Sequence, residues 1–455
     1  DENAVRYRHE VCRELERREV RAPLDRFVVE MRRVHEHLEQ AERLRHPLQR
    51  QAWLLDAIAI YSEAVAGLAA ALAGLELRSR ALRSLRTFLG AYVSSDRFRT
   101  RAAEAGALQE ELSAVEYAIH IQGGRVTVEA PQGQADYGAE VKAAFARFEQ
   151  RAARGYRAQL HDFPDLNHVE ARILELVARL HRDLFDRLAD YCRRERDFLD
   201  PTVARLEREA QVYLAYLDLV ERLAGRGLRF CYPQVSASSA ETAVRDAFDL
   251  ALALKAEREE GTVVTNDLVL SGPERIAVVT GPNNGGKTTF ARMVGQLHHL
   301  AALGLPVPGS SARLLLPDRV FTLFEREEEV GSLRGKLEDE LVRTREVLEQ
   351  ATAQSVVILN ETFTATTLED ARTIGARILR RLLAIGALGV YVTFVDELSA
   401  LGEATVSLVA QVAPADPTQR TFRVVRQPAD GRAYALAIAE QYGLTYDRLL
   451  EAIPA

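Results

Sequence analysis

The spacing of hydrophobic residues divides this chain into two parts. Over residues 1–230 apolar positions recur at intervals of three and four, as on one face of an α-helix, and Gly and Pro are sparse. This pattern predicts long helices, three of which are expected over residues 138–160, 168–195 and 201–224. Further along, short runs rich in β-branched residues alternate with helical patterns, which is typical of an α/β sheet. The predicted strands cover residues 263–270, 275–280, 355–359, 388–393, 406–412 and 421–426.

One segment of the helical part carries a strand signal instead. Polar residues alternate with Ile119 and Ile121, the run breaks at Gly123-Gly124, and alternation resumes with two valines. Two glycines between alternating runs are typical of a two-residue turn. The pattern therefore predicts a small β-hairpin over residues 117–130.

A Pro/Ser-rich stretch over residues 231–240 separates the helical pattern from the pattern of alternating strands and helices, and indicates a domain boundary. A chain of 455 residues is long enough for several domains with substantial cores. We therefore expect a multidomain chain in which a mostly α-helical region over residues 1–230 precedes an α/β domain over residues 231–430. Residues 431–455 are expected to form a further helical segment.

Composition narrows the classes of protein to consider. The net charge of -7 and a pI of about 5.9 argue against capture of nucleic acid by overall charge, so any such contact must come from local basic patches. The three cysteines, Cys12, Cys192 and Cys231, are scattered and indicate a cytoplasmic protein with free thiols. We identify no signal peptide and no apolar run near the roughly 18 residues that span a bilayer, so no membrane partner is expected. Because the chain opens on Asp1 and not on Met, we expect sequence upstream.

The most specific motif runs from Gly281 to Thr288 as GPNNGGKT and fits the pattern G-x-x-x-x-G-K-[ST]. It follows an apolar run over residues 276–279 and precedes a helical pattern over residues 290–303, the context that a phosphate-binding loop requires. Glycines let backbone N–H groups converge on an anion, and the helix adds the positive end of its dipole. Lys287, one of only four lysines among 59 basic residues, offers a compact charge to the β- and γ-phosphates of ATP, and Thr288 offers a hydroxyl to Mg²⁺.

A pair of polar residues ends the apolar run over residues 355–359. Asn360 and Glu361 would stand at the carboxyl end of a buried parallel strand, at the sheet edge where a phosphate loop lies. ATPases with such a loop usually carry an Asp that helps to hold Mg²⁺ and then a Glu that orients the attacking water. Asn360 keeps an oxygen for the metal without the charge, and Glu361 can polarise the water.

Together these segments resemble the ATPase domain of the MutS family, the ABC-type ATPases of DNA mismatch repair. Residues 280–289 match the family's usual TGPNMGGKST, and Asn266 and Leu268 occupy its positions beside the adenine. The resemblance is strong over about residues 260–450. It is weaker over residues 1–230, which are similar to the family's helical core and lever domains.

Shorter segments extend the resemblance. Phe321-Thr322 is similar to the family's FTR segment, and residues 364–370 are similar to its Thr/Ser-rich loop. Thr393 with Glu397-Leu398 resembles its TH..EL switch. Residues 434–450 resemble the start of its C-terminal dimerisation helices.

The chain also departs from the family's pattern. The signature Ser that acts on the partner's nucleotide is Gly335 here and is followed by Lys336. The switch His that follows Thr393 is Phe394, and the aromatic residue that stacks on adenine is Val263. We identify no mismatch-recognition domain, and the predicted hairpin is too small for a full DNA clamp. The resemblance therefore indicates a divergent branch of the family.

The resemblance implies a slow, magnesium-dependent ATPase that produces ADP and phosphate. Glu361 is the expected catalytic residue, Thr288 and Asn360 are the expected metal ligands, and Thr393 and Phe394 form the switch. A homodimer would close around ATP, with Gly335 and Lys336 reaching the partner's nucleotide. The residues expected to contact ATP are Gly281, Pro282, Asn283, Asn284, Gly285, Gly286, Lys287, Thr288, Thr289 and Asn266.

By the same resemblance, the expected role is an ATP-dependent DNA-binding ATPase in DNA repair or recombination. Two alternatives remain open: an ATPase that handles branched DNA in recombination without recognising mismatches, and a nucleotide-gated scaffold with negligible turnover. A run of seven arginines between residues 78 and 101 could contact DNA phosphates. It could equally form an exposed helix face paired with acidic neighbours.

Overall fold

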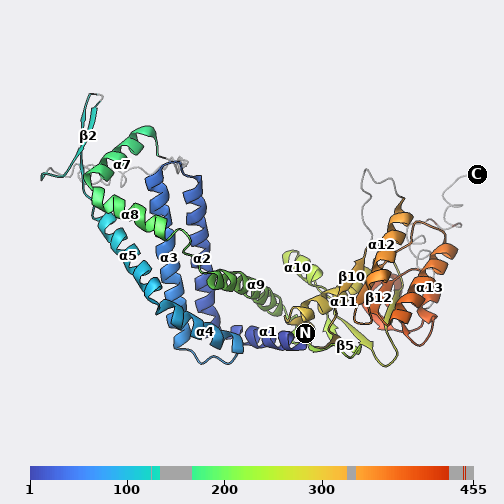
Figure 1. The fold of residues 1–455 in the computed structure, drawn as a ribbon. Coiled ribbons are helices and arrows are strands. Elements are labelled where there is room, and N and C mark those ends of the chain that lie inside the picture. Colours follow the sequence, from blue (N-terminus) through green and yellow to red (C-terminus); the bar gives the residue numbers. More distant parts are fainter. Residues whose placement is uncertain (124, 134–165, 325–334, 430–443, 445, 447–455) are drawn as a thin grey trace, which may run out of the picture. The chain divides into compact units, whose positions relative to one another are not determined.

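The computed structural model describes residues 1–123, 125–133, 166–324, 335–429, 444 and 446 (Figure 1). The chain divides into two compact units, a helical unit of residues 14–214 and a sheet unit of residues 1–13 and 215–455. The boundaries fall inside α1 (Glu2–Leu15) and α9 (Pro201–Ala224), so the end of α9 belongs to the sheet unit. The Pro/Ser-rich stretch over residues 231–240 lies within that unit and is not its boundary.

The helical unit is built around α3 (Pro47–Ala73), whose buried residues lie along most of its length. α3 runs beside α2 (Arg18–Arg43) and also packs against α4 (Arg80–Val93), α5 (Asp96–Ser113) and α8 (Arg182–Arg194) (Figure 1). α3 has the length and apolar composition of a membrane span, so the expectation that no such run exists is wrong. Its packing on four helices accounts for that composition as a core helix.

Three predictions for the helical part of the chain have clear outcomes, and the helix over residues 201–224 is confirmed as α9. The hairpin is confirmed: β1 (Ala118–Gln122) pairs antiparallel with β2 (Arg125–Glu129), with Gln122 opposite Arg125. The single helix over residues 168–195 is wrong. It is broken at His181, whose backbone leaves the helical region, into α7 (His168–Leu180) and α8. The predicted helix over residues 138–160 lies outside the described residues.

The arginines between residues 78 and 101 do not form one exposed face. Arg78 precedes α4, and the other six are divided between α4 and α5, which Ser79 and Ser95 cap separately. Arg101 is buried and donates to Glu195, with 2.7 Å between its Nε and Oε2. Arg99 pairs with Asp96.

The sheet unit is organised by a six-stranded sheet. Its order is β10-β11-β12-β7-β13-β14, and all neighbours are parallel except β13 and β14. All six runs predicted as strands contain a strand. The members of this sheet are β7 (Ile276–Thr280), β10 (Val320–Leu323), β11 (Val356–Asn360), β12 (Leu388–Val392), β13 (Thr405–Ala413) and β14 (Asp416–Arg426).

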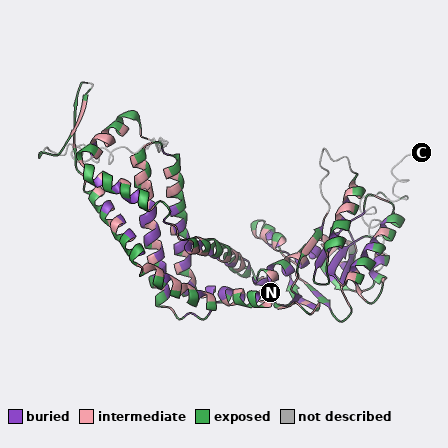
Figure 2. Cartoon of the chain, in the orientation of Figure 1, coloured by how far each residue is buried: buried purple, intermediate pink, exposed green. Residues whose placement is uncertain are grey.

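Helices cover both faces of this sheet, and the buried residues concentrate on its central strands (Figure 2). Val357 and Leu359 of β11 join a cluster with residues of α12 (Lys336–Gln350) and α13 (Leu368–Ile385). Ile358 between them faces α11 (Lys287–Ala302), where a Cβ at Gly295 would lie 3.6 Å from it. Strands buried on both faces explain the continuous apolar runs in the sequence.

A second, four-stranded sheet lies in the same unit with order β4-β9-β5-β6. Of these four strands, the sequence patterns predicted only β6. A 3₁₀ helix over Asp396–Ala400 follows β12. The remaining elements are β3 (Phe230–Cys231), β4 (Gln234–Ser236), β5 (Thr242–Ala247), α10 (Leu250–Arg258), β6 (Asn266–Leu270), β8 (Val307–Pro308) and β9 (Ser311–Leu315).

Candidate nucleotide site

The loop between β7 and α11 has the backbone conformation that its glycines allow. Gly281 and Gly286 have φ angles of 113° and 92°, and Asn284 between them has a φ of 59°. Gly286 is the N-cap of α11 and has no side chain that could accept hydrogen bonds from the N–H groups of the first turn. Such a turn leaves N–H groups available to an anion at the positive end of the helix.

The hairpin of β13 and β14 packs tightly against this loop. A Cβ at Gly281 would lie 2.9 Å from the carbonyl oxygen of Ala410, and one at Gly285 would lie 3.1 Å from the Ala410 Cβ. At Gly286 the nearest neighbour would be Phe422, at 3.7 Å. The close approach of the hairpin therefore favours glycine at Gly281 and Gly285, whereas at Gly286 the positive φ angle does so.

Lys287 lies inside the loop with only 5% of its surface exposed. Its Nζ donates to the carbonyl oxygens of Gly281 and Pro282, both at 3.0 Å, and lies 3.7 Å from Oε1 of Glu361. Burial lowers the pKa of Lys287, the Glu361 carboxylate opposes that shift, and the charge of Arg420 adds to it. Polyphosphate oxygens would satisfy this ammonium better than two neutral carbonyls.

Asn360 and Glu361 end β11 beside the loop, as the sequence predicts. Glu361 adopts a φ of 49° while its N–H donates to the carbonyl oxygen of Val392 at 2.9 Å. The Oδ1 of Asn360 is buried and has no hydrogen-bond partner among the described residues. An unpaired buried acceptor costs free energy unless a ligand or water satisfies it, so this oxygen fits a role beside a hydrated cation.

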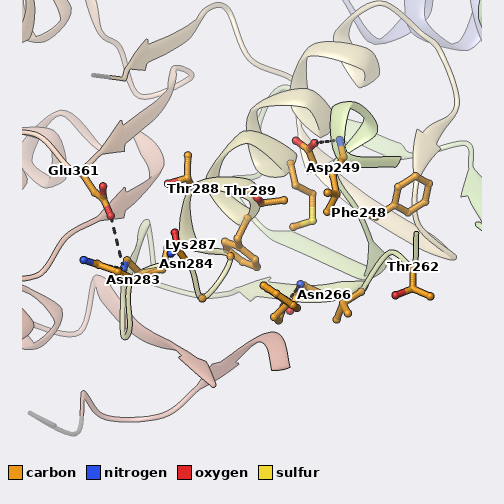
Figure 3. Close-up of a pocket in the computed structure, with 17 residues that line it drawn as sticks. Phe248, Asp249, Thr262, Asn266, Asn283, Asn284, Lys287, Thr288, Thr289 and Glu361 are labelled. Carbon is orange, nitrogen blue, oxygen red and sulfur yellow. Dashed lines mark hydrogen bonds and ion pairs between the residues drawn. The ribbon is translucent and has the colours of Figure 1, made fainter. Parts of the chain in front are cut away.

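A pocket of about 730 Å³ extends from the loop toward α10 (Figure 3). Its volume lies within the usual range for sites that bind small molecules. Glu361 lies at one end, and Phe248 and Thr262 lie at the other (Figure 3). Of the residues expected to contact ATP, those that line the pocket are Asn266, Asn283, Asn284, Gly285, Gly286, Lys287, Thr288 and Thr289. Gly281 and Pro282 instead contribute the carbonyl oxygens that hold Lys287.

Asn266 lines the pocket, but its amide is engaged by the neighbouring strand. Its Nδ2 donates to the carbonyl oxygen of Phe422 at 3.1 Å, and its Oδ1 accepts from the N–H of Val424 at 2.7 Å. These bonds hold β14 where its pairing with β13 is irregular and where Phe422 has a φ of 58°. Asn266 thereby supports the conformation that places Phe422 against the pocket.

Two residues of β14 beside the loop, Phe422 and Arg420, were not among those expected from the sequence. Phe422 lines the pocket, and 49% of the residue is exposed. Val263, at the position expected for the stacking aromatic residue, packs with Phe248 in a small apolar cluster. Arg420, two residues before Phe422, donates from Nε to the carbonyl oxygen of Asn283 at 3.1 Å. An aromatic and a basic residue two apart on a strand were the available signal, but alternation alone cannot place a strand beside a loop.

The residues of the signature and the switch do not line this pocket. Gly335 and Lys336 stand at the start of α12, and a Cβ at Gly335 would meet nothing within 4 Å among the described atoms. Thr393 is buried, and its hydroxyl accepts from the N–H of Val395 at 3.1 Å. Phe394 is 49% exposed.

Comparison with known proteins identifies the sheet unit. Residues 277–452 match the family model for MutS domain V. The chain is 30% identical over 296 residues to an endonuclease MutS2 from Thermomicrobium roseum, covering 63% of this chain and 36% of that protein. It is 30% identical over 294 residues to a DNA mismatch repair protein MutS from Azorhizobium caulinodans, covering 62% and 31%.

A third relative is the DNA mismatch repair protein MutS of Thermotoga petrophila, 26% identical over 241 residues, which cover 52% of this chain and 29% of that protein. The chain thus spans about a third of the length of these curated relatives. The matched domain contains the phosphate-type loop, β11 and Glu361, which are the segments that carried the resemblance in the sequence. The C-terminal part of the chain therefore contains a MutS domain V, and the chain is similar to proteins of the MutS family.

Proposed function

We propose that this chain binds ATP with Mg²⁺ in the pocket beside Lys287 and hydrolyses it slowly. The observation that supports the proposal is that the loop after β7, the start of α11 and the Glu361 carboxylate lie together. Lys287 begins α11, directly after a loop in which several residues have positive φ angles. Oε1 of Glu361 lies 3.7 Å from the Nζ of Lys287. This arrangement offers cationic and N–H groups to phosphates and a carboxylate to water.

Each end of the pocket would have a distinct role in binding. The phosphates would lie along the loop, where Lys287 and the first turn of α11 stabilise their charge. The base would lie between Phe422 and the apolar side chains near Phe248. Thr288 and Asn360 would hold Mg²⁺, which when bound neutralises charge on the β- and γ-phosphates.

Hydrolysis would depend on Glu361 and be slow for reasons visible in the site. Glu361 would orient water and accept its proton as the water oxygen bonds to the γ-phosphorus and the bond from that phosphorus to the bridging oxygen breaks, so that ADP leaves. Asn360 lacks the negative charge that usually helps to hold the metal. Phe394 has no donor for the γ-phosphate, and Thr393, whose hydroxyl accepts from the N–H of Val395, does not line the pocket.

We further propose that two copies of the chain pair around ATP and act on DNA in repair or recombination. The support is the MutS domain V and the similarity to a DNA mismatch repair protein MutS and to an endonuclease MutS2. Gly335 and Lys336, outside the pocket of their own chain, would approach the partner's phosphates from the start of α12. The predicted dimerisation segment over residues 431–455 falls outside the described residues except for 444 and 446.

One alternative is a nucleotide-gated scaffold that binds ATP without turnover. It is favoured by the departures at Asn360 and Phe394, while the placement of Glu361 beside Lys287 favours an enzyme. A second alternative is control of branched DNA in recombination, without recognition of mismatches. Measured ATP turnover distinguishes the scaffold from an ATPase. Binding to a panel of DNA structures distinguishes control of branched DNA from mismatch repair.

The decisive experiment compares wild type with Glu361→Gln for ATP binding by calorimetry and for steady-state phosphate release. The variant should bind ATP at least as well, because a carboxylate near the phosphates is removed. It should release phosphate at least roughly tenfold more slowly, the low end of the loss of a general base. Equal rates would assign the activity to another group, and binding without any turnover would support the scaffold.

DNA binding is tested with homoduplex, mismatched, branched and single-stranded DNA, each with and without ATP. We expect salt-sensitive binding without a preference for a single mispair, because basic side chains read phosphates and not bases. A clear preference for a mispair over homoduplex would show that mismatch recognition is retained.

A further inference from the structure

The segment that follows β11 contains two strained residues around the proposed catalytic carboxylate. Glu361 has a φ of 49° and Phe363 a φ of 64°, both in the left-handed region. Each such residue other than Gly costs about 1–2 kcal/mol, so neighbouring contacts must hold the segment in place. The contacts that do so determine where the Glu361 carboxylate points.

One of these contacts is a buried carboxylate from another element. Oε2 of Glu340 accepts from the N–H of Phe363 at 2.7 Å, and Glu340 is only 8% exposed. Within the described part of the chain no ion pair reaches Glu340. Burying a charged carboxylate is costly, and a hydrogen bond to a backbone N–H offsets part of that cost.

The other contacts of the segment come from the sheet. The N–H of Glu361 donates to Val392, and the hydroxyl of Thr362 donates to the Tyr391 hydroxyl at 3.2 Å. Burial and the nearby Glu340 carboxylate raise the pKa of Tyr391, in agreement with the closeness of these groups. The sheet therefore fixes the start of the segment, and Glu340 fixes its end at Phe363.

Glu340 belongs to α12, the helix that begins at Lys336. One helical turn thus separates the segment proposed to meet the partner's nucleotide from the carboxylate that holds Phe363. A movement at the start of α12 would be transmitted through a 2.7 Å hydrogen bond to the backbone that carries Glu361.

We infer that Glu340 is a positioning residue that holds Glu361 in its working orientation and links that orientation to the start of α12. The inference rests on the proposed ATPase function. It assigns to Glu340 no contact with nucleotide or water. The positioning role requires a side chain at residue 340 that is long enough to place an acceptor oxygen at the N–H of Phe363. The negative charge of that side chain is secondary.

The test compares two substitutions that separate the length of the side chain at residue 340 from its charge. Glu340→Gln keeps an acceptor oxygen at full length without the charge, and Glu340→Asp keeps the charge but withdraws the oxygen by one methylene. We expect Gln to keep phosphate release within about threefold of wild type and Asp to lower it about tenfold or more, since misplacement by about 1 Å is costly. ATP affinity by calorimetry should stay within about twofold for both. Glu346→Gln, at an exposed position of α12, is the control.

Combining each variant with Glu361→Gln tests whether Glu340 acts through that residue. In the Glu361→Gln background Glu340→Asp should cause no further loss, since coupled residues are not additive. Hydrogen exchange should show faster exchange of the Phe363 amide in Glu340→Asp and unchanged exchange in Glu340→Gln. The same tenfold loss in both backgrounds, or a greater loss with Gln than with Asp, would overturn the inference.

The failure of the proposed function would look different. A wild-type chain without ATP turnover would overturn both proposals. Wild-type turnover that depends on Glu361 but is indifferent to Glu340→Asp would overturn only the positioning role.

Discussion

The Nζ of Lys287 lies 3.7 Å from Oε1 of Glu361, which joins the phosphate-type loop to the end of β11. The lysine is 5% exposed, whereas the Glu361 side chain is 36% exposed. Polyphosphate would therefore compete with Glu361 for a lysine that is already fixed in place.

Replacement of Lys287 by Ala should weaken ATP binding by about tenfold to a hundredfold. A hydrogen bond to a charged group contributes about 1.5–3 kcal/mol, and about 1.4 kcal/mol is a factor of ten. Lys287→Arg should also impair binding, because the buried site is shaped for a compact ammonium. Calorimetry with ATP and Mg²⁺ measures both variants, and Lys255→Ala at an exposed site is the control. Unchanged affinity in Lys287→Ala would refute the assignment of the phosphate site.

Phe422→Ala should weaken binding of ATP by about tenfold without weakening binding of inorganic tripolyphosphate. Stacking of a base on an aromatic side chain contributes about 1–3 kcal/mol, and tripolyphosphate has no base. Phe422→Tyr should restore ATP affinity, and Val425→Ala on the same strand should be neutral. Equal losses for ATP and tripolyphosphate would mean that Phe422 supports the loop at Gly286 and does not contact the base.

Arg420→Gln should lower affinity for ATP and tripolyphosphate by about threefold to tenfold and leave affinity for adenosine unchanged. Its guanidinium is bound to the loop at Asn283 and adds positive charge near Lys287. Arg420→Lys should recover most of the affinity if the charge matters. The salt dependence of ATP binding should weaken in Arg420→Gln but not in Arg426→Gln, whose arginine pairs with Glu274. An equal effect on adenosine would indicate a purely structural contact.

Acidification should destabilise the sheet unit through His298, which lies fully buried in α11. Burial lowers its pKa from 6.5 to about 4, so between these values the unfolded chain binds a proton that the folded chain does not. Stability is therefore lost as the pH falls through this window, at about 1.4 kcal/mol for each pKa unit. His9, with a pKa of about 4, contributes with the same sign.

Denaturant unfolding between pH 7 and pH 4 measures this effect. His298→Gln should flatten the pH dependence of the free energy of unfolding. His299→Gln, at the exposed neighbouring position, should leave the slope unchanged. The same slope in wild type and His298→Gln would contradict the buried neutral histidine.

The sequence alone determined the elements whose signals are local. The GPNNGGKT loop was predicted because its positive φ angles favour glycines, which the motif displays. The central strands were predicted because they are buried on both faces and therefore form continuous apolar runs. The same holds for the position of Glu361 after β11, because parallel strands deliver their ends to one edge. The break at His181 was missed because helical periodicity continues across it.

Only the tertiary structure decided which distant residues complete the site. Phe422 and Arg420 reach the loop because β13 and β14 form a hairpin over it, and Asn266 proved to bind the backbone of β14. The contact between Glu340 and Phe363 joins residues of different elements. Periodicity reports only which face of an element is buried, whereas these contacts depend on how the elements pack against one another.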